Sequence, residues 1–151
     1  MNITSIPYNA LEAFNAQKVR EYAPAIAYCT TVIVLGVVGN AFTVAYYGFH
    51  VPRTTTNVII TALGTADFIA CLTFTDSIIK ICYTLTYKNV AACKLMFFCK
   101  HTLVMASACI LVLVAVDRYR RICKPFAWQL SVKLANIVIV CIVVFSILLS
   151  V

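Results

Sequence analysis

The sequence predicts an all-α fold, a bundle of four transmembrane helices. Of its 151 residues, 63% are hydrophobic and only 11% are charged, which is too little polar cover for a water-soluble domain of this size. Four apolar segments, at about 23–47, 57–81, 93–123 and 132–151, reach or approach the roughly 20 residues that a helix needs to cross about 30 Å of hydrocarbon. Strands are excluded as spans, because a few lipid-exposed strands cannot close a barrel.

The first two segments are separated by a clear break in the chain. Residues 1–22 form the expected N-terminal tail, and the segment after them carries no charge and has Pro24 in its first turn, where the missing N–H removes no hydrogen bond. The stretch 48–56, with Pro52, ends this helix before the second one begins.

The second segment contains an acidic residue at its middle. At the position of Asp67, inserting an acidic side chain into the membrane costs about 2.5–3.5 kcal/mol. We therefore expect Asp67 to face the bundle interior and to have a partner or a function. Asn40 in the first segment and Ser107 in the third lie at a similar depth.

The third segment carries a stripe of residues at helical spacing. Lys100 is the only charged residue between Leu95 and Val116, and Pro125 ends or kinks the helix. One face of this helix holds a cation near one end, a hydroxyl at mid-depth and an arginine at the other end, about 27 Å from that cation. The residues of the stripe are Lys100, Leu103, Ser107, Leu111, Val114 and Arg118.

The basic residues suggest an orientation with the N-terminus outside the cell. Arg118, Arg120, Arg121 and Lys124 cluster at one membrane edge, where each is attracted to anionic inner-leaflet lipid by about 1 kcal/mol. Asn2-Ile3-Thr4 is a glycosylation acceptor on the tail that would then be extracellular. The net charge of +7 is explained by lipid and partner contacts, and no surface for nucleic acid is expected.

Several short motifs follow one another along the segments. They are Gly39-Asn40, Thr56-Asn57 with Leu63 and Ala66-Asp67, Cys93, Asp117-Arg118-Tyr119 at a 25-residue interval from Cys93, and Pro125-Phe126. Together they resemble the rhodopsin-like family of G-protein-coupled receptors. The resemblance implies a seven-helix plasma-membrane receptor, of which this chain would be the N-terminal part with four helices, as a fragment or a truncated product. No enzyme activity is expected, because no nucleophile and base are paired in the sequence, and no cofactor is expected.

The resemblance assigns a switch to the end of the third helix. Arg118 would pair with Asp117 at rest and be released to meet a heterotrimeric G-protein, with Tyr119 beside it. Phe126, after Pro125, would insert into a hydrophobic pocket of the G-protein. The alternatives are that Arg118 snorkels to the interface and that Phe126 anchors the loop on the membrane.

The resemblance also assigns two further sites, a sodium pocket and a disulfide. Asn40, Asp67 and Ser107 would form a sodium pocket, with Asp67 and Ser107 as ligands; the alternative is a hydrogen-bonded core without an ion. Cys93 would form a disulfide with a cysteine beyond Val151, with Cys82 as a competing partner.

The expected ligand is extracellular and is a peptide in preference to an amine. Amine receptors of the family have an aspartate eighteen residues before the motif arginine, and this chain has Lys100 there. The ligand pocket is expected to include Lys100, His101, Leu103 and Val104, with cations suited to an anionic group. The run 118–126 is similar to neuropeptide receptors of the cholecystokinin and orexin type. The alternatives are a four-helix membrane scaffold and a transporter fragment.

Overall fold

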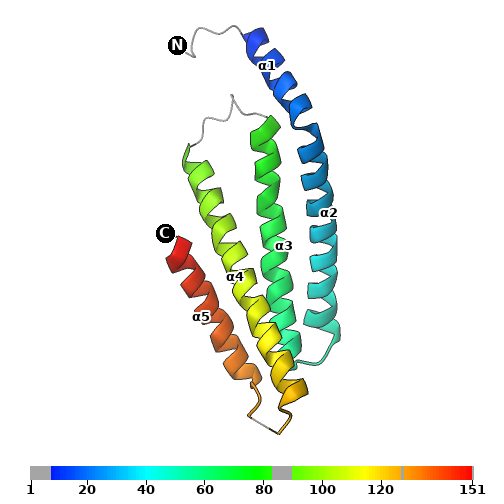
Figure 1. Ribbon diagram of the computed structural model, residues 1–151, viewed down its shortest axis with the longest axis vertical. Helices are drawn as coiled ribbons and strands as arrows, with labels where there is room; N and C mark the ends of the chain where they lie inside the picture. The colour runs from blue at the N-terminus through cyan, green and yellow to red at the C-terminus, as the bar shows by residue number, and fades with distance from the viewer. Residues whose placement is uncertain (1–7, 83–89, 127, 151) are drawn as a thin grey trace.

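The computed structural model describes residues 8–82, 90–126 and 128–150, and the described part is almost entirely helical. Helices α2, α3, α4 and α5 lie side by side as an up-and-down bundle, and α1 extends beyond it at the N-terminal end (Figure 1). The elements in order are α1 (Tyr8–Glu21), α2 (Ala23–Ala45), the π-helix η2 (Tyr46–His50), α3 (Thr55–Cys82), α4 (Val90–Cys123) and α5 (Val132–Ser150).

Four helical stretches of the described chain are long and apolar enough to cross a membrane. They are Ala23–His50, Thr55–Lys80, Ala91–Cys123 and Val132–Ser150. No strand occurs among the described residues. The predicted all-α membrane bundle is therefore confirmed.

Helix α1 lies in the N-terminal tail, for which the sequence predicted no helix. An isolated helix of 14 residues is marginal in water, but backbone hydrogen bonding here runs on into α2. The Tyr22 N–H donates to the Lys18 carbonyl at 3.0 Å, and the Ile26 N–H donates to the Tyr22 carbonyl at 2.9 Å. The long apolar helix thus extends past the membrane segment, which hydrophobicity alone does not indicate.

The break between α2 and α3 is a π-turn followed by a short linker. His50 closes η2 with Nδ1 at 3.1 Å from the Ala45 carbonyl oxygen. The Asn57 side-chain amide donates to the Pro52 carbonyl at 2.8 Å, and the Thr54 hydroxyl accepts from the Asn57 N–H at 3.3 Å. These bonds satisfy free backbone groups at the start of α3.

The buried core is small and lies where α3, α4 and α5 meet. Ile59, Ile110 and Ala135 are each at most 1% exposed there. Helices α2 and α3 approach closely instead through small residues, and a Cβ added at Gly36 would lie 2.5 Å from the Cys71 sulfur. Small residues at helix contacts are typical of membrane bundles, whose outer faces meet lipid rather than water.

Candidate functional site

Asp117 is the centre of a polar network at one end of the bundle, which we call the Arg118 end. The side chain is 2% exposed. Its Oδ2 accepts a hydrogen bond from the Thr56 hydroxyl at 2.6 Å, and both carboxylate oxygens accept from Arg121 Nε, at 3.0 and 3.2 Å. The neighbouring Thr55 hydroxyl donates to the Leu130 carbonyl at 2.8 Å. The network therefore ties α3 to α4 and to the segment that leads into α5.

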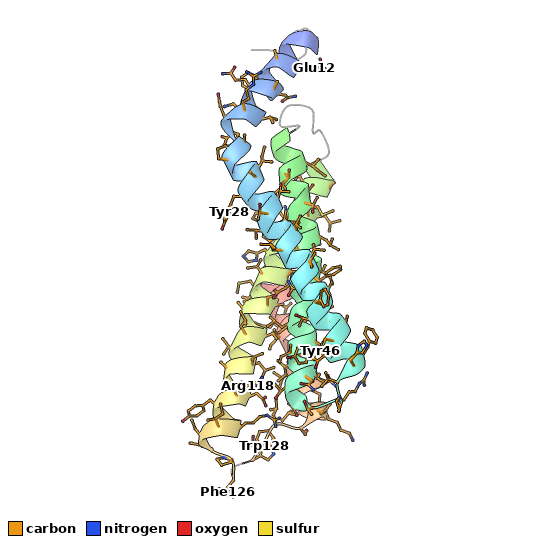
Figure 2. The ribbon with its side chains drawn as sticks, turned by 90° about the vertical axis from the view of Figure 1, so that its right-hand side faces the viewer. Glu12, Tyr28, Tyr46, Arg118, Phe126 and Trp128 are labelled. Atoms are coloured by element: carbon orange, nitrogen blue, oxygen red, sulfur yellow. The ribbon has the colours of Figure 1, made fainter. Side chains whose placement is uncertain are left out.

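The expected pairing of Asp117 with Arg118 is wrong for this structure. Asp117 forms its ion pair with Arg121, one helical turn further on, while the Arg118 side chain is exposed at the end of α4 (Figure 2). Successive residues of a helix point in different directions, whereas residues four apart share a face. The i, i+4 spacing of Asp117 and Arg121 was the signal that the sequence analysis did not use.

The linker between α4 and α5 presents aromatic side chains at the same end. Phe126 is fully exposed, and it lies at the tip of the molecule near Trp128 (Figure 2). The Arg120 guanidinium lies 5.1 Å from the centre of the Trp128 ring, within the range of a cation–π contact. The Gln129 amide donates to the Lys124 carbonyl at 3.0 Å and so bridges the turn beneath Phe126. Phe126 is thus exposed on a turn that the Gln129 side chain stabilises by a hydrogen bond.

Asn40, Asp67 and Ser107 line one cavity of about 570 Å³ between α2, α3 and α4. Each comes from a different helix, and they are the three residues that the family resemblance grouped as a sodium pocket. The Ser107 hydroxyl is buried and has no hydrogen-bond partner among the described residues. A buried hydroxyl without a partner carries a free-energy penalty unless a ligand or water satisfies it. The three side chains therefore offer a carboxylate and neutral oxygens to a shared space.

An ionic cluster, formed by Asp76, Lys80 and Lys100, lies between α3 and α4 toward the other end of the bundle. The Asp76 Oδ2 lies 2.6 Å from Lys80 Nζ and 3.5 Å from Lys100 Nζ. Lys100 also donates to the Ser77 hydroxyl at 2.7 Å, and its ammonium lies 5.7 Å from the centre of the Phe74 ring. Asp76 thus compensates part of the Lys100 charge that was expected to face a ligand.

The four residues predicted to form the ligand pocket do not face the same space. Val104 lines the cavity that contains Asp67, and Lys100 contacts Ser77 at its border. His101 instead lies with Nδ1 3.1 Å from the Ser150 hydroxyl of α5, and Leu103 lines a second cavity between α3, α4 and α5. Within the described residues the four side chains therefore share no single cavity, because neighbouring helical positions point about 100° apart, and the ligand pocket stays a prediction.

Comparison with known proteins decides which family these features belong to. The family model described as 7 transmembrane receptor (rhodopsin family) matches residues 39–151. The chain belongs to this rhodopsin family of receptors. It is a multi-pass protein of the plasma membrane, and its relatives are receptors rather than enzymes. The scaffold and transporter alternatives are therefore set aside.

Individual receptors show the same relationship at lower coverage. The chain is 31% identical to the neuropeptide Y receptor type 6 of Oryctolagus cuniculus, over 83% of this chain and 34% of that protein. It is 31% identical to the neuropeptide Y receptor type 2 of Homo sapiens, over 76% of this chain and 30% of that protein. It is 29% identical to the C5a anaphylatoxin chemotactic receptor 1 of Oncorhynchus mykiss, over 67% of this chain and 29% of that protein. The chain thus spans about a third of the length of these receptors.

Two further sites expected for a receptor remain predictions. Cys93 is half-buried and takes part in no disulfide among the described cysteines, and the side chain of its competing partner, Cys82, lies outside the described residues. The glycosylation acceptor Asn2 also lies outside them.

Proposed function

We propose that this chain supplies the first four transmembrane helices of a receptor that signals from an extracellular peptide to a heterotrimeric G-protein. In this proposal the N-terminus is extracellular and the Arg118 end faces the cytoplasm. The observation that carries it is the arrangement at that end: Asp117 is buried and fully engaged by Thr56 and Arg121, while Arg118 is exposed. Because Asp117 is already paired with Arg121, Arg118 is available to a cytoplasmic partner.

The exposed residues around Arg118 suit a protein partner in this role. Phe126 projects from a turn braced by the Gln129 side chain, and Tyr119 is 55% exposed on the last turns of α4. An exposed aromatic anchor beside a guanidinium is the composition enriched at the centres of protein interfaces. We infer that Phe126 and Arg118 contact the same G-protein.

The ionic cluster supports a peptide ligand in preference to an amine. Lys80 and Lys100 share the single carboxylate of Asp76, so the cluster retains a net positive charge beside the cavity. An ammonium ligand would be repelled there, whereas an acidic group of a peptide would be attracted. Two of the relatives are named for neuropeptide Y, which agrees with a peptide ligand. Val104 and Lys100 are the pocket residues that this proposal retains.

The cavity at mid-depth supports a sodium ion as an allosteric ligand. Asp67 would supply the negative ligand, and Asn40 and Ser107 neutral oxygens, which is the donor chemistry that hard cations prefer. The buried and unsatisfied Ser107 hydroxyl is the observation that favours an ion or a water molecule over a dry hydrogen-bonded core. Among the described residues that line this cavity, Asp67 is the only acidic one.

The proposed function is tested in a chimera that continues this chain after Val151 with the remaining helices of the neuropeptide Y receptor type 2. Cells that express the chimera are exposed to a peptide and an amine panel, and G-protein activation is measured together with surface labelling of an N-terminal epitope. We expect a peptide response that Arg118→Ala abolishes. The matched variant Arg120→Ala removes an arginine that stacks on Trp128 at the same helix end, and it should retain the response.

Three results would contradict the proposal. One is an epitope that is labelled only after the cells are made permeable. Another is an amine response that exceeds the peptide responses. The third is equal signalling by the Arg118→Ala and Arg120→Ala variants at equal surface expression.

A further inference from the structure

A second cavity lies on a different side of the bundle from the one that contains Asp67. Its volume is about 540 Å³, and its walls come from α3, α4 and α5, with the end of η2 at one margin. The first cavity is formed by α2, α3 and α4 instead. We call this second cavity the α3–α5 groove, and its lining includes Arg53, Asn57, Thr61, Asn136, Ile139 and Val143.

The groove changes from polar to apolar along its length. Arg53, Asn57 and Asn136 lie at the Arg118 end, and Ile69 and Val143 lie further along α3 and α5. From Asn57 to Ile69 the helix rises about 18 Å at 1.5 Å per residue, and one leaflet contributes about 15 Å of the hydrocarbon core. The groove thus matches the depth of one leaflet, with Arg53 and Asn57 at the end nearest the membrane surface.

The threonines along the groove do not make its middle polar. The Thr61 hydroxyl donates to the Asn57 carbonyl, and the Thr65 hydroxyl donates to the Thr61 carbonyl, each at 2.8 Å. Both hydroxyls are satisfied by their own helix, so the side chains offer methyl groups to an occupant. An occupant therefore meets an apolar wall over most of the length.

Asn136 is the group that this side of the bundle leaves without a partner. Its side chain is exposed and makes no hydrogen bond within the described residues, although it lies inside the span Val132–Ser150. It is four residues from the start of α5, about 6 Å into the membrane segment. An amide at this depth needs a hydrogen-bonding partner, because hydrocarbon supplies none.

Charge at the polar end determines which kind of lipid fits. Arg53 is exposed, and none of the described residues that line the groove is acidic. Asp117, the acidic residue at this end, is already engaged by Thr56 and Arg121. A guanidinium with no carboxylate beside it binds phosphate oxygens through paired N–H donors.

We propose that the α3–α5 groove binds one anionic glycerophospholipid from the leaflet at the Arg118 end. The phosphate contacts Arg53, the glycerol and ester oxygens accept hydrogen bonds from the Asn136 amide, and an acyl chain lies along Thr61, Thr65 and Val143. In the orientation proposed above, this is the inner leaflet, which is rich in anionic lipid.

The test measures lipid retained by the purified full chain with native mass spectrometry, during titration with phosphatidylglycerol or phosphatidylcholine of the same acyl chains. We expect one phosphatidylglycerol to bind in preference to phosphatidylcholine. Arg53→Gln should weaken this binding about fivefold, the factor that corresponds to about 1 kcal/mol for one cationic contact. Lys124→Gln is the matched control, because it removes an exposed cation of the same end that does not line the groove.

Two further variants separate the headgroup from the chain. Asn136→Leu should weaken phosphatidylglycerol and phosphatidylcholine alike, since both carry the same ester groups. Thr65→Phe fills the groove and should displace both lipids, and far-UV circular dichroism checks that each variant is still helical. A photoactivatable phosphatidylglycerol that labels α3 and α5 of the unmodified chain provides a readout that needs no substitution.

Specific outcomes overturn the proposal. Equal weakening by Arg53→Gln and Lys124→Gln would show a diffuse charge effect. Equal retention of the two phospholipids, or a sterol that occupies the groove and excludes them, would identify a different occupant. Labelling confined to α2 would place the lipid elsewhere.

Discussion

Replacing Thr56 with valine removes one hydroxyl and preserves the shape of the side chain. The hydroxyl donates to Asp117 Oδ2 at 2.6 Å, and Asp117 is 2% exposed. The other donor to this carboxylate, Arg121, has a side chain that is 38% exposed. The two contacts therefore differ in how strongly water competes with them.

Typical hydrogen-bond free energies predict which of the two contacts to Asp117 contributes more to stability. Hydrogen bonds to charged groups contribute about 1.5–3 kcal/mol in proteins, while side-chain bonds between membrane helices reach only about 1.7 kcal/mol. We therefore expect Thr56→Val to lower the free energy of unfolding by about 1.5 kcal/mol. The Arg121 side chain is 38% exposed, so water competes with its i, i+4 contact to the buried Asp117, and Arg121→Gln should lower this free energy by only about 0.5 kcal/mol.

The assay is reversible unfolding of the chain in mixed micelles with increasing dodecyl sulfate, followed by circular dichroism. Thr65→Val is the matched control, because it removes a hydroxyl from the same helix whose bond goes to the backbone of that helix. The reasoning would be refuted if Thr56→Val and Thr65→Val had the same effect. It would equally fail if Arg121→Gln proved the more destabilising of the two network variants.

Three other predictions concern different parts of the chain. Gly36→Ala should destabilise the bundle by about 1–3 kcal/mol, because the new Cβ lies 2.5 Å from the Cys71 sulfur, and Cys71→Ala should relieve the effect. Asp67→Ala should abolish the sodium dependence of the chimera's peptide affinity, measured in sodium against potassium buffer. The hydrogen bond from Lys18 lowers the pKa of Glu21 below its ordinary value of 4.5, so the stabilising contribution of this pair to α1 is present above that value and is lost as the pH falls through the lowered pKa.

Each of these predictions has a control within the chain. Gly39→Ala places a Cβ that meets no other described part of the chain within 4 Å beyond its neighbours and its own helix backbone, so it should not destabilise the bundle; a loss of stability as large as that of Gly36→Ala would contradict the packing argument. Ser107→Ala should reduce the sodium dependence in the same direction as Asp67→Ala, and unchanged sodium dependence in both variants would support a core without an ion. In a carboxyl NMR titration, Lys18→Ala should raise the pKa of Glu21, and an unchanged pKa would count against the pair.

The positions of the membrane spans, and the depth of polar residues within them, were predictable from the sequence. Apolar length located the spans, and Asn40, Asp67 and Ser107, which lie at similar depth and which the family resemblance grouped together, line one cavity. Two kinds of feature were not predictable in this way. Which charged neighbours pair depends on helix rotation, so Asp117 was assigned to the adjacent arginine and Lys100 was left without Asp76.

Helix α1 was missed for a different reason. A polar segment of 14 residues has no apolar face that periodicity can detect. It is helical because its last turn shares backbone hydrogen bonds with the first turn of α2, and that continuity is invisible in composition.

This continuity couples the N-terminal segment to the bundle. Helices α1 and α2 together span about 57 Å from Tyr8 to Ala45, interrupted by the turn at Tyr22, and this length is almost twice the thickness of the hydrocarbon core. The hydrogen bonds across the turn join the two helices end to end. We therefore expect a partner that binds α1 to change the tilt of α2, whose Asn40 lines the cavity that Asp67 shares.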